Sequence, residues 1–378
     1  MPQTRRQQIA PLRRLDPVML LVLATIVVFG IIMLASAGTV IGYERFGDSN
    51  YYIKHHLLYG ILLGAIGFWL GSRLHYRIWQ QLSLPLLIIT ILLLIIVFIP
   101  GIGLDLKGAH RWIIIGDLTF QPAELAKLTF LFYLATWLEK RGEGVKDFSY
   151  GFLPFLFILG IVAGLILLEP DFSTMLVLAF MAVTVFFIAG ASIMHVSWLG
   201  IASIIFFLLV IKLTPYRAAR FTVFLQPDAD PQGIGYHINQ ALLAIGSGGL
   251  FGLGLGHSRQ KFNYLPEAPG DSIFAVIAEE LGFIFSIVLI SLFIVLMMRG
   301  FKIARRAPDA FAKYLVVGII TWITFQAFFN IAAMVGLVPL TGIPLPFISH
   351  GSTAVAVSLT AMGIVMNVAR HSKTELSP

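Results

Sequence analysis

The chain has 378 residues, of which 58% are hydrophobic and 12% are charged, with a formal net charge of +7 at pH 7 and no cysteine. A soluble domain carries about 25% charged residues, so this composition indicates a polytopic membrane protein and excludes a string of soluble domains. The missing cysteine excludes disulfides and thiol catalysis. The positive charge does not indicate nucleic-acid binding, because the basic residues lie between apolar runs.

Ten apolar runs along the chain are expected to be membrane helices. They lie at residues 17–37, 54–70, 83–100, 122–139, 151–168, 175–190, 197–213, 272–298, 314–335 and 352–369. An even number places both termini on one side of the membrane. Lys and Arg are densest at 299–313, which places that connection and both termini in the cytoplasm. We therefore predict an all-α, polytopic fold with ten transmembrane helices in a single domain, 1–378.

This topology places three notable segments on the extracellular side of the membrane, at residues 101–121, 214–270 and 336–351. The second is a large extracellular loop between helices 7 and 8. Within it, the glycine-rich stretch 246–256 is expected to form a bent or re-entrant segment held against protein, because irregular backbone cannot face lipid. The inner connections are short and the chain has no phosphate-binding loop motif, so no cytoplasmic nucleotide site is expected.

Four polar residues lie in or next to the earlier runs. Glu124 and Lys127 are three residues apart on one helix face, where they form either a self-neutralising pair or a site for an anionic substrate group. Arg111 precedes Trp112 at interface depth, which suits either anchoring or substrate binding. Asp171 follows the fifth run and either caps the sixth helix or contributes to a site.

The large loop and the eighth run carry the remaining candidates. Arg217 and Arg220 are outer cations that either face solvent and headgroups or bind substrate. Asp271 lies where the loop meets the eighth helix, so its carboxylate is expected to stay ionised yet fixed in place; alternatively it only caps that helix. Glu279 and Glu280 lie two to three turns deeper, where carboxylates are costly and by default mark function.

These residues predict an outward-facing site that combines a carboxylate with several cations. That pattern suits an anionic lipid headgroup such as a pyrophosphate, together with a proton acceptor. It also suits a proton-coupled transporter, which the deep Glu279 and Glu280 favour slightly. No internal repeat is visible, however, and this disfavours the inverted-repeat transporters.

Motifs spread over almost the whole chain resemble the SEDS family (shape, elongation, division and sporulation), the membrane glycosyltransferases that polymerise peptidoglycan. The motifs are Gly108-Ala-His-Arg-Trp112, Gln121-Pro-Ala-Glu-Leu-Ala-Lys127, Pro170-Asp171, Gly235-Tyr236-His237, Ala244-Ile-Gly-Ser-Gly-Gly249, Leu265-Pro-Glu-Ala268 with Asp271, Ala278-Glu-Glu-Leu-Gly282 and Pro344-Leu-Pro-Phe-Ile-Ser349. The segment 252–266 is more similar to the division type, FtsW, than to the rod-shape type, RodA.

The resemblance implies ten membrane helices with both termini cytoplasmic, in a bacterial cytoplasmic membrane, with the active site facing outward. It implies polymerisation of lipid II onto a glycan on undecaprenyl pyrophosphate, by inverting displacement with Asp271 as general base. The family's other important polar positions match Arg111, Glu124, Lys127 and Asp171. The leaving pyrophosphate needs positive charge from Arg111, Lys127 or a divalent cation such as Mg²⁺ or Mn²⁺, which the sequence neither shows nor excludes.

The implied partner is a class B penicillin-binding protein, because the chain has no transpeptidase domain of its own. Three local sequences depart from the family pattern. The family usually has His-Thr-Asp-Phe at 269–272, Ser-Tyr-Gly-Gly-Ser at 349–353 and Gln at 169, where this chain has Pro-Gly-Asp-Ser, Ser-His-Gly-Ser-Thr and Glu. The alternative functions are a lipid II flippase or proton-coupled transporter, and a non-catalytic scaffold for a partner enzyme.

Overall fold

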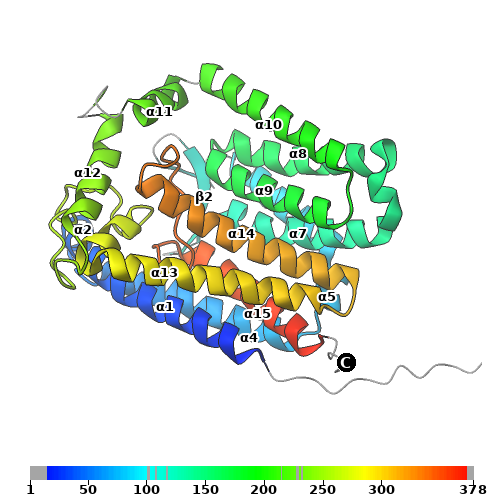
Figure 1. The fold of residues 1–378 in the computed structure, drawn as a ribbon, viewed down its shortest axis with the longest axis horizontal. Coiled ribbons are helices and arrows are strands. Elements are labelled where there is room, and N and C mark those ends of the chain that lie inside the picture. Colours follow the sequence, from blue (N-terminus) through cyan, green and yellow to red (C-terminus); the bar gives the residue numbers. More distant parts are fainter. Residues whose placement is uncertain are drawn as a thin grey trace, which may run out of the picture.

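The structure is a computed structural model that describes residues 15–99, 103–106, 109–115, 118–213, 215–226, 230 and 233–372. Most of the long helices run roughly parallel to one another (Figure 1). The first half contains α1 (Pro17–Ala37), α2 (Thr39–Phe46), α3 (Tyr51–His55), the π-helix η1 (His56–Leu62), α4 (Leu63–Arg73), α5 (Arg77–Gln81), α6 (Ser83–Ile96), α7 (Pro122–Arg141), η2 (Gly142–Lys146), η3 (Phe148–Phe152), α8 (Leu153–Leu168) and α9 (Phe172–Ile188). The second half contains α10 (Ile193–Leu213), α11 (Pro215–Leu225), α12 (Ile234–Ser247), α13 (Ile273–Arg305), α14 (Ala310–Met334) and α15 (Ser352–Arg370).

Each of the ten predicted apolar runs corresponds to a helix, with α3, η1 and α4 forming the second. Six spans are long and apolar enough to cross a membrane: α1, the stretches Tyr51–Arg73 and Phe148–Leu168, α13, α14 and α15. The helices of the third, sixth and seventh runs are apolar but shorter. The helix of the fourth run, α7, belongs to neither group and carries both Glu124 and Lys127.

The core of the bundle lies around α14 and α15. Their most apolar windows are 78% and 83% buried inside the protein, against 17–39% for the other four spans. Helix α14 packs against α13, α9 and α7, while α15 packs against α4 and η1. The outer helices therefore present apolar side chains to their surroundings, as expected of helices that face lipid.

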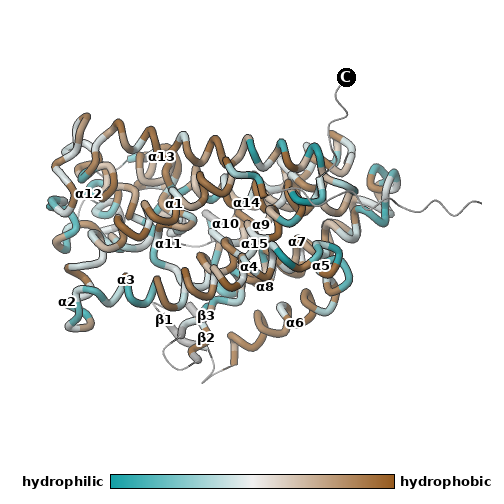
Figure 2. Tube along the Cα trace, turned by 90° about the horizontal axis from the view of Figure 1, so that it is seen from below, coloured by the Kyte–Doolittle hydropathy of each residue, from teal (hydrophilic) through white to brown (hydrophobic). Residues whose placement is uncertain are grey.

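The two ends of the bundle are polar, whereas its middle is hydrophobic (Figure 2). Helix α1 begins and α15 ends at the same end (Figure 1). Ion pairs tie this end together, with Arg299 and Asp16 3.0 Å apart and Arg77 and Asp309 3.1 Å apart. Helices α11, α12 and α2 gather at the opposite end.

A small sheet interrupts the helical pattern between α6 and α7. Strands β1 (Gly103–Leu106), β2 (Ala109–Ile115) and β3 (Leu118–Phe120) pair antiparallel in the order β1-β2-β3, with Gly103 opposite Ile113 and Ile113 opposite Phe120. The predicted all-α class describes the helical bundle, but the small sheet was not predicted. Three consecutive isoleucines, Ile113–Ile115, favour a strand here. β3 leads directly into α7, whose first residue is Pro122.

The glycine-rich segment after α12 is held against protein, as predicted. Helix α13 contains a break at Gly282, where φ is +79°. The break frees backbone groups, and the amides of Leu253 and Gly254 donate to the carbonyls of Glu279 and Glu280, each at 2.9 Å. A side chain at Gly252 would clash with the Glu280 carbonyl. Glycine is therefore required for this close approach, which satisfies polar backbone at membrane depth.

Candidate active site

Asp271 lies in the turn just before α13 and is half-buried. The N-cap of α13 is Ser272, and no side chain makes the capping hydrogen bond. The alternative prediction that Asp271 only caps this helix was therefore wrong. Its backbone carbonyl accepts a hydrogen bond from Asn330 Nδ2 of α14 at 2.8 Å, which fixes the residue while leaving the carboxylate available.

The electrostatic surroundings of Asp271 favour a weakly acidic carboxyl group. Burial, together with the nearby negative charge of Glu267, raises the pKa of Asp271 to about 6, while Arg220 opposes this shift. Its Oδ1 accepts a long hydrogen bond of 3.5 Å from Ser272 Oγ. A carboxylate with this pKa is ionised at neutral pH and still basic enough to take up a proton.

The segment between α14 and α15 organises the residues around Asp271. Its carbonyl oxygens at 340, 341, 343 and 344 each accept a hydrogen bond from a side chain of another element. The donors are Arg220 of α11 (3.0 Å), Ser173 of α9, Asn330 of α14 (2.7 Å) and Gln326 of α14 (2.9 Å). The segment therefore locks three helices together directly beside Asp271.

A cavity of about 190 Å³ lies between α11, α12 and this segment. Arg220, Tyr236, His237, Pro266 and Leu340 contribute to its lining. Complete small-molecule pockets measure about 300–1,000 Å³, so this cavity holds only part of a larger substrate. It combines a cation with several hydrogen-bonding groups, and two of its lining residues act on the turn that carries Asp271: Arg220 through its charge and His237 through Ser272.

His237 of α12 connects the cavity to the turn that carries Asp271. Its Nε2 lies 2.6 Å from Ser272 Oγ, and that hydroxyl also lies 2.7 Å from the carbonyl of Pro266. Ser272 is fully buried. Sequence reasoning placed His237 in a motif but gave it no role, because its partner Ser272 lies 35 positions away in the sequence.

Glu124 and Lys127 form a buried ion pair inside the bundle, away from the cavity lining. Lys127 Nζ lies 2.9 Å and 2.8 Å from the two carboxylate oxygens of Glu124 and 3.0 Å from Gln326 Oε1, and it sits over the ring of Trp322. Gln326 in turn donates to the Pro344 carbonyl. The pair is thus connected to the segment beside Asp271 through one residue of α14.

Arg111 and Asp171 come together at the outer end of α8. Arg111 on β2 donates to the carbonyl oxygens of Glu169, at 2.8 Å, and Pro170. Asp171 accepts from the Thr174 amide at 3.0 Å and from Gln121 Nε2 at 3.0 Å, so it caps α9. Burial and the neighbouring Asp171 raise the pKa of Glu169 to about 9, so its carboxyl group is protonated at neutral pH.

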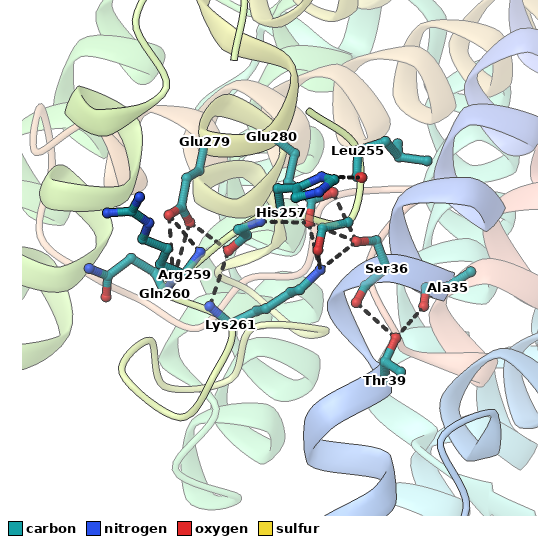
Figure 3. Close-up of polar contacts among 12 residues, drawn as sticks. Ala35, Ser36, Thr39, Leu255, His257, Arg259, Gln260, Lys261, Glu279 and Glu280 are labelled. Atoms are coloured by element: carbon teal, nitrogen blue, oxygen red, sulfur yellow. Dashed lines mark hydrogen bonds and ion pairs between the residues drawn. The ribbon is translucent and has the colours of Figure 1, made fainter. Parts of the chain in front are cut away.

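Glu279 and Glu280 bind the re-entrant segment (Figure 3). Glu279 accepts hydrogen bonds from Ser258 Oγ at 2.5 Å and from the Arg259 amide at 2.9 Å. Glu280 accepts from Ser36 Oγ of α1 at 2.7 Å and pairs with Lys261 Nζ at 2.8 Å. Both carboxylates are buried and turned to this loop. The depth of Glu279 and Glu280 in the membrane slightly favoured a proton-coupled transporter, and their bonds to this loop now explain why they lie there.

The structure thus brings Asp271 and Arg220 together and places the other candidates in separate clusters. The side chain of Arg217 lies outside the described residues. Asn330 and Gln326 were missed, although two polar residues four apart on one face of an apolar run were a visible signal. Among the described residues, no three His, Cys, Asp or Glu side chains gather in a way that suits a metal ion.

Known proteins match this chain over almost its whole length. The family model described as "Cell cycle protein", for FtsW, RodA and SpoVE, matches residues 16–374. The chain is 38% identical to a probable peptidoglycan glycosyltransferase FtsW of Trichlorobacter lovleyi, over 95% of the chain and 94% of the relative. It is 39% identical to stage V sporulation protein E of Bacillus subtilis, over 96% and 99%.

Solved structures show the same fold. The rod shape determining protein RodA of Thermus thermophilus matches with a TM-score of 0.70 and 27% identity, over 96% of this chain and 98% of that one. A chain from a peptidoglycan synthase complex, solved to explain the coordination of polymerization and crosslinking, matches with a TM-score of 0.76 and 28% identity, over 94% and 98%. These matches confirm a polytopic membrane protein with the RodA fold. The chain therefore belongs to the FtsW, RodA and SpoVE family of cell cycle proteins.

Proposed function

We propose that this protein is a peptidoglycan glycosyltransferase that polymerises lipid II at the outer face of the cytoplasmic membrane. The 4-hydroxyl of the acceptor sugar attacks the anomeric carbon of the donor, undecaprenyl pyrophosphate leaves, and the configuration inverts. The name of the Trichlorobacter lovleyi relative supports this activity. Asp271 acts as the general base that takes the hydroxyl proton as the new bond forms.

The observation that carries this assignment is the state of Asp271. It is a half-buried carboxylate with a pKa of about 6, it does not cap its helix, and it interacts with the charge of Arg220, a cation that lines a nearby cavity. A secondary hydroxyl is a poor nucleophile until its proton has an acceptor. A positioned base of this kind typically contributes about 10²–10⁴-fold in rate.

Arg220 is the residue we propose to meet the departing pyrophosphate, because it lines the cavity and also acts on Asp271. Arg111 and Lys127 remain candidates for this role from the sequence, as does Arg217. The contacts of Lys127 support an indirect role instead, in which the Glu124–Lys127 pair holds Gln326 against the Pro344 carbonyl. Asp171 and Glu279 are proposed to act in the same indirect way, through the backbone that they bind.

A divalent cation was expected from the chemistry of pyrophosphate departure. The described side chains do not form a complete oxygen cage for Mg²⁺ or Mn²⁺. An ion at this site would take part of its ligands from substrate oxygens, as Mg²⁺ commonly does. The described residues alone do not form a resident metal site, so we derive no step through an ion.

The outward orientation follows from the charge distribution. The basic residue Arg299 pairs with Asp16 at the end where α1 begins, and α13, which follows Asp271 directly, begins at the opposite end (Figure 1). Single cysteines in this cysteine-free chain test the orientation. His257→Cys, on the exposed loop, should react with an impermeant maleimide in intact cells, whereas Glu143→Cys, on the exposed connection after α7, should not. The reverse pattern would overturn the outward-facing site.

The partner we propose is a class B penicillin-binding protein that cross-links the new strands. The structural similarity to a chain of a peptidoglycan synthase complex supports this proposal. The activity is tested with purified protein and purified lipid II in detergent. Glycan polymer of increasing length supports a polymerase. Lipid II translocation in sealed vesicles without polymer would identify a flippase, and neither activity would leave a scaffold.

A further inference from the structure

A chain of hydrogen-bonded polar atoms connects Asp271 to the cavity. Of the residues in this hydrogen-bonded chain, only Asp271 has a role in the reaction proposed above. Asp271 Oδ1 lies 3.5 Å from Ser272 Oγ, and Ser272 Oγ lies 2.6 Å from His237 Nε2. His237 lines the cavity from α12. The three residues come from two elements that are more than thirty positions apart in sequence, so the fold itself assembles this chain.

The Ser272 hydroxyl is the middle of this chain and has a single proton to give. Three acceptors surround it: the Pro266 carbonyl at 2.7 Å, Asp271 Oδ1 and the His237 ring. When the ring carries its proton on Nδ1, Nε2 accepts the serine hydrogen. The serine oxygen is then able to accept a hydrogen bond from a protonated Asp271.

We propose that His237 is a positioning residue for Asp271 that also receives the proton Asp271 takes from the acceptor hydroxyl, with Ser272 as the link. This inference rests on the proposed function. In the step, the O–H bond on Asp271 breaks and a new O–H bond forms at Ser272 Oγ. The original serine O–H bond breaks and an N–H bond forms at His237 Nε2. The carboxylate is restored, and the imidazolium loses its proton to water.

The charges around the chain are compatible with this transfer. Arg220 of α11 and Glu267 of the same turn are the charged groups that act on Asp271. Arg220 and His237 share the cavity lining with Tyr236. Asp271 and His237 are both half-buried, and Ser272 between them is fully buried, so the hydrogen bonds through Ser272 connect the base with the imidazole that lines the cavity. This connection gives the protonated base a route to lose its proton between turnovers.

A purely structural role is the competing explanation, in which His237 only fastens α12 to the turn at 266–272. Both explanations predict that removal of the ring lowers activity. They differ in the response to a small added base. A proton-accepting role is restored by free imidazole, whereas a fastening role is not restored by a molecule that makes no covalent link.

The experiment uses the full-length protein in detergent, with purified lipid II as substrate. His237→Ala should lower the rate of polymerisation by about 10²-fold, the lower end for a positioned proton-transfer group. Added imidazole should restore the rate in proportion to its neutral form, because the cavity gains the space of the missing ring. Pyrazole, which has the same shape and is a far weaker base, should restore nothing.

Two variants keep the test decisive. His237→Gln retains a side-chain amide within reach of Ser272 Oγ but no base, and it should be as slow as His237→Ala and unaffected by imidazole. Ser272→Ala should be slow and also unaffected, because the link itself is missing. A His237→Gln variant with normal polymerisation, or a His237→Ala variant that imidazole does not restore, would overturn the proposal. Failure of Asp271→Asn to lower the rate would instead overturn the proposed function.

Discussion

Two acidic sites at the start of one helix, α13, differ in how their carboxylates are bonded. Glu279 and Glu280 are 1% and 0% exposed, and every carboxylate oxygen accepts from a hydroxyl, an amide or an ammonium group. Asp271 is half-buried, and its carboxylate accepts one long hydrogen bond from Ser272 Oγ and one from its own backbone amide. The first site holds a loop in place, and the second has lone pairs left for a substrate.

The difference shows that depth in the membrane does not by itself identify the reactive carboxylate. From sequence, the deeper acids are the more costly and the stronger functional candidates. In the structure their cost is offset by a re-entrant loop that carries Ser258 and Lys261 to them. The group that we propose as reactive is the one that the fold positions through its backbone while leaving its side chain lightly bonded.

The largest effect on folding is expected from a substitution that removes a partner of Glu279 or Glu280. Lys261→Met leaves Glu280 buried beside Ser36 without its cation, and this should lower the free energy of unfolding by about 3–5 kcal/mol. Thermal unfolding in detergent measures the loss. The double variant Lys261→Met/Glu280→Gln should recover most of it. A fully stable Lys261→Met protein would contradict a structural role for this ion pair.

The buried Glu124–Lys127 pair of α7 gives a second test of whether a buried acid has a structural role or acts on the substrate. Lys127→Ala strands Glu124 and Gln326, which should cost about 3 kcal/mol of stability and a large part of the polymerase activity. The matched variant Lys127→Met/Glu124→Gln removes both charges and should fold and polymerise. Assays of unfolding and of polymer yield on the same preparations separate the two effects. A stable but inactive double variant would show that Lys127 meets substrate charge directly.

The pH dependence of the reaction tests the state of Asp271. Its pKa of about 6 means that the base is lost by protonation below that value. The rate should therefore fall about tenfold between the plateau and pH 5. Stability should change in the opposite direction: the pKa of the folded state is above the unfolded one, so protonation as pH falls favours the folded protein. A falling rate accompanied by unfolding would contradict this explanation.

The smallest effect is expected at Asp171, whose carboxylate caps α9. Asn caps helices about as well as Asp, so Asp171→Asn should change stability by less than about 0.5 kcal/mol, whereas Asp171→Ala should cost about 1 kcal/mol. Unfolding and polymerisation measured together provide the test. A large loss of turnover in the Asn variant, without loss of stability, would assign Asp171 to the substrate.

Much of the fold could be predicted because apolar periodicity and length report directly on membrane helices. All ten runs correspond to helices, and the bent glycine-rich segment is present. The sheet at β1–β3 was missed because three short strands in an outer segment carry no long periodic signal. The break at Gly282 was also hidden, since a glycine in an apolar run is read as a tolerated helix residue.

The site was predictable in part, through Asp271 and Arg220. The pairing of Lys127 with Glu124 could be read from their spacing. The contacts of Glu279 with Ser258 and of Lys127 with Gln326 could not, because these partners are distant in the chain. The organising role of the segment 340–344 was equally hidden. Its contacts are made by backbone carbonyls, which every sequence has, and only the fold determines which of them face Arg220 and Asn330.

The central claim is that turnover depends on the lightly bonded Asp271 and not on the engaged Glu279. The most direct test is the initial rate of lipid II polymerisation per folded molecule for Asp271→Asn and Glu279→Gln, purified side by side. We predict that Asp271→Asn folds normally and loses about 10²–10⁴-fold in rate. Folded Glu279→Gln should keep a rate within tenfold of the wild type. Near-normal polymerisation by Asp271→Asn, together with a folded but inactive Glu279→Gln, would contradict the account.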